Sequence, residues 1–140
     1  MAIFGAGSNW EGVEKKEKFF DNQEYVIGWD YNDSKDLYDI ISILKAGDIV
    51  YLKSNQSGSR TLRIKGIGVV CQSLLHNFFD TQINQEKLSI AIKVKWVVKK
   101  EFKITIPPKE GKLTNFRAAT FYEEFLPFVQ KQIIETLFTQ

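Results

Sequence analysis

Cysteine and histidine are nearly absent from this sequence of 140 residues, which contains one of each, Cys71 and His76. A single cysteine has no partner for an internal disulfide, a usage typical of a reducing compartment. Zinc sites need clustered cysteine and histidine ligands, so we expect no metal site. A Ser-His-Asp or Cys-His arrangement would have to use His76, whose polar surroundings favour an exposed loop residue.

Long apolar runs are also missing, and none approaches the roughly 18 residues that a membrane-spanning helix needs. The first residues, 1–5, lack the charged and apolar regions of a secretory signal peptide. Residues 5–9 begin like a dinucleotide-binding GxG motif, but the third glycine is absent, and no Walker motif is present. We therefore expect a cytoplasmic protein without a cofactor, and no enzyme class is recognisable.

The composition is that of an ordinary globular chain, with 44% hydrophobic and 26% charged residues. A chain of this length fits one domain, 1–140, and buries enough surface to fold without a disulfide or metal. Aromatic residues are frequent at 14%, but only three of them are tryptophan. The position of each tryptophan is therefore informative.

Charge is unevenly distributed along the chain. Residues 1–50 carry ten acidic and five basic side chains, whereas residues 87–112 carry eight basic and two acidic ones. A basic half beside an acidic half can mark a surface for a polyanion. The alternative is that the alternating lysines form the solvent side of an amphipathic sheet, where lysine is common.

Hydrophobic periodicity predicts a mixed α+β domain. After a glycine-rich loop at 5–9, the patterns favour a short helix within 11–20, a strand at 25–29, a helix at 34–44, strands at 48–54, 61–70, 87–99 and 102–106, and a C-terminal helix from Thr120. Strands 48–54 and 61–70 are joined by a short polar loop and are expected to pair antiparallel. About five mostly antiparallel strands with flanking helices predict a small, half-closed barrel.

Two tryptophans and a tyrosine fall in or beside predicted loops, namely Trp10, Trp29 and Tyr31. A flat aromatic face near a flexible loop is a common platform for a nucleic-acid base. The alternative is that Trp10 and Trp29 fill the ends of the barrel as core residues. Trp96 lies on the apolar side of its strand, so we expect it in the core.

Short polar and basic side chains flank these aromatic residues. The candidates for reading the edge of a base or for ligand contact are Ser8, Asn9, Lys53, Ser54 and Asn55, and the candidates for phosphate contact are Arg60, Arg63, Lys65 and Arg117. The alternative for the polar residues is that they hydrogen-bond their own backbone in turns.

Four segments together resemble the PUA-like superfamily, and the EVE and YTH type most of all. They are Asn9–Trp10, Tyr25–Trp29, Leu44–Lys53 with its Gly-Asp before an apolar strand, and Ile64–Val70 with its Ile-x-Gly-Ile-Gly-Val pattern. Residues 115–122 are similar to a segment that follows the last strands in EVE-like modules of restriction-type proteins. The resemblance covers about residues 3–122.

This resemblance implies an open barrel with an aromatic pocket that accepts a flipped, often methylated, base of DNA or RNA. By position, Trp10 and Trp29 match the pocket aromatics, Tyr31 stands in for a third, and Ser8, Asn9 and Ser54 become the edge readers. Such a module would bind nucleic acid and would need no membrane, metal or cofactor.

Two other functions stay open from the sequence. The same scaffold can serve as a protein-interaction or regulatory domain, which the acidic first half favours. The other is an enzyme of the related ASCH type, which would process RNA or hydrolyse nucleotides. That activity would require a lysine and a carboxylate facing one pocket, such as Lys53 with Asp30 or Asp48.

Overall fold

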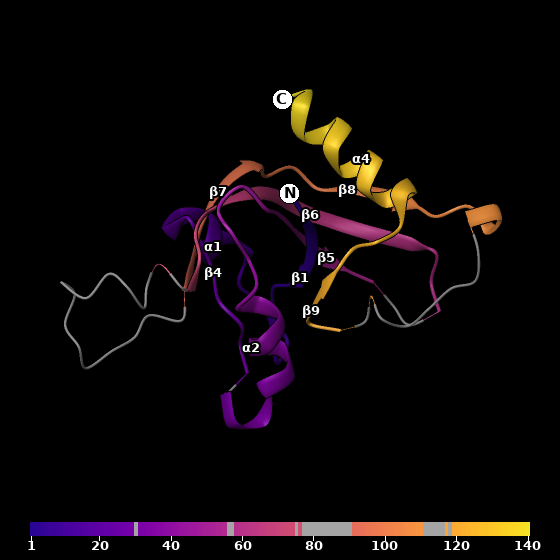
Figure 1. The fold of residues 1–140 in the computed structure, drawn as a ribbon. Helices are drawn as coiled ribbons and strands as arrows, with labels where there is room; N and C mark the ends of the chain where they lie inside the picture. Colours follow the sequence, from indigo (N-terminus) through magenta and orange to yellow (C-terminus); the bar gives the residue numbers. More distant parts are fainter. Residues whose placement is uncertain (30, 56–57, 75, 77–90, 111–116, 118) are drawn as a thin grey trace.

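The computed structural model describes residues 1–29, 31–55, 58–74, 76, 91–110, 117 and 119–140 (Figure 1). Its strands are β1 Ile3–Gly7, β2 Asn9–Trp10, β3 Val13–Glu14, β4 Glu24–Tyr25, β5 Ile49–Ser54, β6 Thr61–Gln72, β7 Ile92–Val98, β8 Phe102–Thr105 and β9 Phe121–Glu123. Its helices are α1 Lys16–Asn22, α2 Lys35–Ile41 and α4 Pro127–Phe138, with 3-10 turns η1 Tyr31–Asp33 and η2 Pro108–Glu110.

One curled sheet organises the described part of the chain. Its seven strands follow the order β4-β7-β6-β5-β1-β9, with β8 paired to β6, while β2 and β3 form a separate hairpin. Helix α4 lies across one side of this sheet, and α2 projects from the other (Figure 1). The predicted mixed α+β class with a curled sheet and flanking helices is thus confirmed, and none of the described helices is long and apolar enough to cross a membrane.

Most neighbouring strands pair antiparallel, as expected. The predicted hairpin is formed by β5 and β6, and its register shifts between Leu52 and Lys53. The pairing of β1 with β5 is the exception, because these two strands run parallel, with Ile3 opposite Ile49. Parallel neighbours need a long crossover, which α1, β4 and α2 occupy here.

Three predicted elements differ from the structure. The prediction of a glycine-rich loop at 5–9 is wrong, because β1 lies inside the sheet between β5 and β9. Glycine is needed at position 5 for close packing, since a Cβ there would overlap the ring of Tyr122. The helix expected from Thr120 begins only at Pro127, after β9. The strand expected at 25–29 ends at Tyr25, and the chain then bends.

The sheet carries an apolar cluster on each of its two faces. On one face, Phe19 and Phe20 of α1 pack with Trp96 of β7, so the predicted core position of Trp96 is confirmed. On the other face, Val129 and Ile133 of α4 cover strands β5, β6 and β8. The sheet is therefore buried on both sides, and burial of this apolar area is the main source of its stability.

A buried polar network fastens the last strand and α4 to the sheet. The carboxylate of Glu124 accepts hydrogen bonds from the Tyr51 hydroxyl at 2.8 Å and from Arg117 Nε at 2.8 Å and Nη2 at 2.6 Å. The backbone N–H of Leu126, just before α4, donates to the same carboxylate at 3.1 Å. The hydroxyl groups of Tyr51 and Tyr122 lie 2.8 Å apart. Each buried polar group in this network thus has a partner, as burial requires.

Replacing Glu124 tests this network. We expect Glu124→Gln to lower the free energy of unfolding by about 3–5 kcal/mol, because it leaves the Arg117 guanidinium buried without a counter-charge. Urea unfolding followed by tryptophan fluorescence measures the change. Glu135→Gln is the matched control, since Glu135 is exposed and forms a surface pair with Lys131 on α4, and its effect should stay below about 0.5 kcal/mol. Equal effects of the two substitutions would contradict the assigned role.

Candidate functional site

A pocket of about 370 Å³ lies where the β2–β3 hairpin meets the bend after β4 and the residue before β9. Its lining residues are Asn9, Trp10, Glu11, Val13, Lys15, Gly28, Trp29 and Thr120. Three residues predicted from the sequence, Asn9, Trp10 and Trp29, therefore meet in one place. Asn9 and Trp10 are neighbours in β2, whereas Trp29 comes from a separate part of the chain and is brought to them by the fold.

Trp10 forms the inner wall of the pocket. Its ring is half-buried and packs against the core, with the Phe19 ring edge-on at a centroid distance of 6.0 Å. The ring also lies directly against the α-carbon of Gly28, because a Cβ at that position would overlap the indole. The Lys15 ammonium lies 5.3 Å from the ring centroid. Within the described residues, the indole N–H has no acceptor.

Trp29 forms the outer wall and is 53% exposed, so it is not a core residue. Its indole N–H donates to the Thr120 hydroxyl at 3.0 Å. Its backbone carbonyl accepts a hydrogen bond from the Tyr38 hydroxyl of α2 at 2.8 Å. The first bond fixes the indole ring and the second the backbone that carries it, so a large aromatic ring is held in position at the surface.

The β2–β3 hairpin supplies the polar groups of the pocket. Asn9 Oδ1 accepts a hydrogen bond from the backbone N–H of Gly12 at 2.8 Å, which leaves its amide nitrogen without a partner among the described residues. Glu11 occupies the left-handed region with φ 50° at the turn, and Lys15 follows the hairpin. The sequence analysis missed Glu11 and Lys15, although the Glu11–Gly12 pair between alternating residues was a signal for a turn.

Ser8 and Lys65 are not positioned as predicted. Both are buried, with Lys65 only 2% exposed. The Lys65 ammonium donates to Ser8 Oγ at 2.8 Å and to Glu14 Oε2 at 2.7 Å, and Ser8 Oγ donates to Glu14 Oε1 at 2.5 Å. Ser8 and Lys65 therefore contact each other and Glu14 and do not line the pocket. Burial raises the pKa of Glu14, but the hydrogen bonds from Lys65 and Ser8 outweigh it and lower this pKa below its usual value.

Lys53 does not line the pocket but binds the chain that leads to it. Its buried ammonium donates to the carbonyl oxygens of Arg117 at 2.6 Å and Ala119 at 2.8 Å, and it lies 5.3 Å from the ring centroid of Tyr122. These contacts fix the chain just before Thr120. Burial and the nearby charge of Lys65 lower the pKa of Lys53 to about 8.

Ser54 and Asn55, also predicted as ligand contacts, are half-buried and do not line the pocket. Asn55 Oδ1 is buried and has no hydrogen-bond partner in the part of the chain that the structure describes. The backbone of Tyr31 lies in η1, but its side chain falls outside the description. The third aromatic wall therefore stays a prediction.

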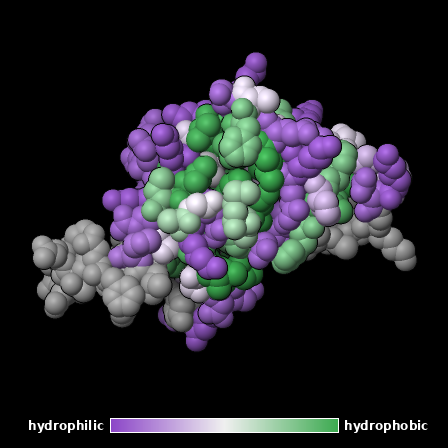
Figure 2. All heavy atoms as spheres, turned by 45° about the horizontal axis from the view of Figure 1, so that its top comes forward, coloured by the Kyte–Doolittle hydropathy of each residue, from purple (hydrophilic) through white to green (hydrophobic). Residues whose placement is uncertain are grey.

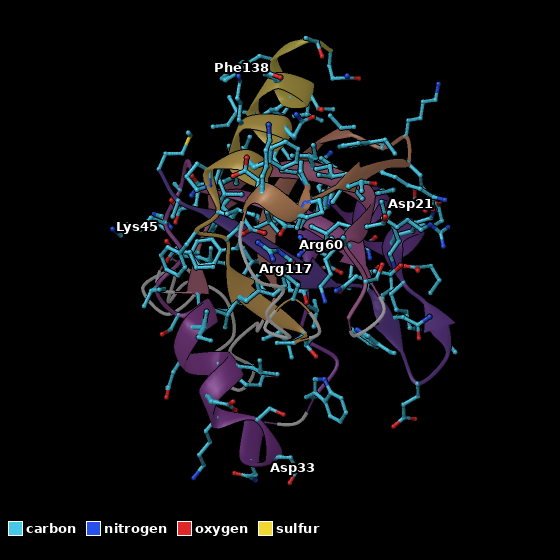
Figure 3. All side chains as sticks on the ribbon, turned by 90° about the vertical axis from the view of Figure 1, so that its right-hand side faces the viewer. Asp21, Asp33, Lys45, Arg60, Arg117 and Phe138 are labelled. Carbon is cyan, nitrogen blue, oxygen red and sulfur yellow. The ribbon has the colours of Figure 1, made fainter. Side chains whose placement is uncertain are left out.

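The predicted phosphate contacts separate into buried and exposed groups. Arg117 is buried against Glu124, so it does not face solvent as predicted. Arg60 Nη1 donates to the carbonyl oxygen of Pro107 at 3.2 Å, and both Arg60 and Arg117 appear near the centre of the side view (Figure 3). Arg63 points outward, with half of its side chain exposed, and forms an ion pair with Glu101 at 2.7 Å.

The lysine–carboxylate pair that an ASCH-type enzyme would need is not formed by Lys53 and Asp48. The Asp48 carboxylate accepts hydrogen bonds from the backbone N–H groups of Ala2 and Lys45, each at 2.9 Å, and thereby ties β1 to the start of β5. Asp30 lies outside the described residues. Within the described ranges, no group of three His, Cys, Asp or Glu side chains could hold a metal ion.

Comparison with protein-family models gives no match, and comparison with curated proteins gives none either. The functional argument therefore depends on the geometry of the pocket and on the surface around it.

The lowered pKa of Lys53 predicts a pH dependence of stability. Between the folded pKa of about 8 and an unfolded value of about 10.4, the unfolded chain binds more protons, so the free energy of unfolding rises with pH. In Lys53→Met this rise should be absent. We expect the parent protein to gain about 2–3 kcal/mol relative to Lys53→Met between about pH 7.5 and 10.

Urea unfolding at a series of pH values measures this difference. Lys95→Met is the control, because Lys95 is exposed on β7 and its replacement should leave the pH dependence unchanged. Parallel curves for the parent and Lys53→Met would show that the Lys53 amine keeps an ordinary pKa.

Proposed function

We propose that this protein binds nucleic acid and accepts one unstacked base, modified bases included, in the pocket between Trp10 and Trp29. The observation that carries the proposal is that both rings line one pocket of about 370 Å³, with Trp29 exposed at its rim. This volume lies within the range of sites that enclose small ligands. Stacking on an aromatic face contributes about 1–3 kcal/mol per base.

The groups around the rings suit the edge of a base. The amide nitrogen of Asn9 and the indole N–H of Trp10 are donors for ring nitrogen or carbonyl acceptors, and the Glu11 carboxylate can accept from an exocyclic amino group. Val13 adds an apolar contact of the kind that favours a base methyl group. The pocket therefore offers both stacking and edge recognition, which a flipped base requires.

The resemblance to the PUA-like superfamily supports the same proposal. The curled sheet with flanking helices is compatible with the open barrel of that superfamily. The segments that carry the resemblance also contain the pocket rings, since Trp10 and Trp29 end two of them.

Substitution of the rim tryptophan tests the proposal. We expect Trp29→Ala to weaken binding of a single-stranded oligonucleotide by about 5- to 150-fold, which corresponds to the loss of one stacking contact. Fluorescence anisotropy with oligonucleotides that carry one methylated or one unmodified central base gives the affinities and the preference for the modification.

Phe138→Ala is the matched control, because Phe138 is an exposed aromatic residue on α4 and does not line the pocket. Its affinity should equal that of the parent protein. Absence of binding by the parent to DNA or RNA at low salt would reject the proposal.

Protein binding is a second candidate function, and exposed apolar residues favour it. Phe125, two residues before α4, and Phe138, the last residue of α4, are 70% and 75% exposed. Figure 2 shows the molecule with the α4 side turned forward, and apolar side chains gather in the middle of this face. Patches of this kind often mark interaction sites.

Analytical ultracentrifugation of the parent and of Phe125→Ser/Phe138→Ser tests this candidate. Concentration-dependent association of the parent that disappears in the double variant is the expected result. A parent that stays monomeric at every concentration would argue against pairing of this face with a second copy.

A further inference from the structure

Basic side chains form a strip on the surface that leads away from the pocket. The strip starts at the pocket wall, crosses the beginning of α1 and the turn between β7 and β8, and reaches β6 and β8; its members are Lys15, Lys16, Arg63, Lys99, Lys100 and Lys103. Only Arg63 was among the phosphate contacts predicted from the sequence. The strip is therefore a product of the fold.

Contacts and strand register place four of these residues on one surface. Lys15 lines the pocket, and the next residue, Lys16, donates to Glu101 Oε1 at 2.5 Å. Arg63 donates to the same carboxylate, from Nε at 3.0 Å and from Nη2 at 2.9 Å. Lys103 of β8 is the register partner of Arg63 on β6.

The remaining two lysines, Lys99 and Lys100, immediately precede Glu101 in the turn and are exposed. Because Glu101 bridges Lys16 and Arg63, the turn, α1 and β6 are held together at this point. The hydrogen bonds from Lys16 and Arg63 also lower the pKa of Glu101, which is the response of a carboxylate to a positive surrounding.

The charge of the strip is not balanced by its own contacts. Lys99, Lys100 and Lys103 form no ion pair with any described residue, and among those residues the side chains of Lys16 and Arg63 share the one carboxylate of Glu101. Simple alternation along a strand explains the exposed Lys93 and Lys95 of β7. It does not explain the strip, whose members come from α1, β6, β8 and two connecting segments.

We propose that this strip binds the phosphodiester backbone of the strand whose base occupies the pocket. The inference rests on the proposed function and deepens it by naming the surface that the rest of the ligand follows. Phosphate contacts of this kind fix the position of the strand, whereas the pocket reads the base. Exposed lysines also release counterions on binding, so the affinity must depend on salt concentration.

The experiment compares Lys99→Gln/Lys100→Gln/Lys103→Gln with the control Lys45→Gln/Lys109→Gln/Lys131→Gln. The control removes the same charge from other surfaces; Lys45, for example, lies on the opposite side of the molecule from Asp21 of α1 (Figure 3). Fluorescence anisotropy with a short single-stranded oligonucleotide is recorded from about 50 to 200 mM salt, the range over which phosphate contacts change affinity steeply.

We expect the strip variant to bind at least about 10-fold more weakly than the control at the lowest salt concentration. We also expect the slope of log affinity against log salt to become shallower by about 2, because each lost phosphate contact on a single strand contributes about 0.7. An affinity and slope equal to those of the control would overturn the inference.

Trp29→Ala and an oligonucleotide with one abasic position separate this inference from the proposed function. If Trp29→Ala weakens binding while the strip variant matches the control, the pocket stands and the strip is rejected. If the strip variant is weakened while Trp29→Ala and the abasic position have no effect, the strip stands and the pocket is rejected. A parent protein that binds no oligonucleotide overturns both.

Discussion

The carboxylate of Glu124 is the contact on which the rest of this structure depends. It is fully buried and joins the middle of the sheet through Tyr51, the segment before β9 through Arg117, and the start of α4 through Leu126. The Lys53 ammonium binds the same segment through the carbonyl oxygens of residues 117 and 119. A buried charge is costly unless every partner is in place, so these elements are held in one arrangement.

The pocket inherits its geometry from this arrangement. Because the segment before β9 is fixed, Thr120 has a defined position, and its hydroxyl in turn holds the indole of Trp29. Trp10 comes instead from a short hairpin whose base is tied to β6 by Lys65 and Glu14. Two local elements, each anchored in the interior by a buried cation, thus present two aromatic rings to one volume, next to a surface rich in lysine.

Much of the fold could be predicted from the sequence where the signal is local. The β5–β6 hairpin, the helix after Ser34 and the alternating β7 follow from periodicity and turn residues, and β7 places Trp96 in the core. Strand β1 was missed because its glycines suggest a loop, although Gly5 is there to make room for the ring of Tyr122. Strand β9 was missed because its apolar residues continue smoothly into the pattern of α4.

The candidate site was predictable only in part, because only some of its residues carry a local signal in the sequence. Trp10 and Trp29 could be found because large aromatic residues beside loops are unusual, and Asn9 was found as the polar neighbour of Trp10. The burial of Lys65 and Arg117 could not be predicted, since each pairs with a carboxylate whose position depends on tertiary structure. A basic residue that pairs in the interior and one that faces solvent look alike in a sequence.

The contact between Gly28 and the ring of Trp10 has a further consequence. Since the indole rests on bare backbone, the position of the inner wall is set by the main chain and not by a side chain that could change rotamer. The outer wall is held as well, because Thr120 and Tyr38 bind the indole and the carbonyl of Trp29. A ligand would therefore meet two walls that are already in place before it binds.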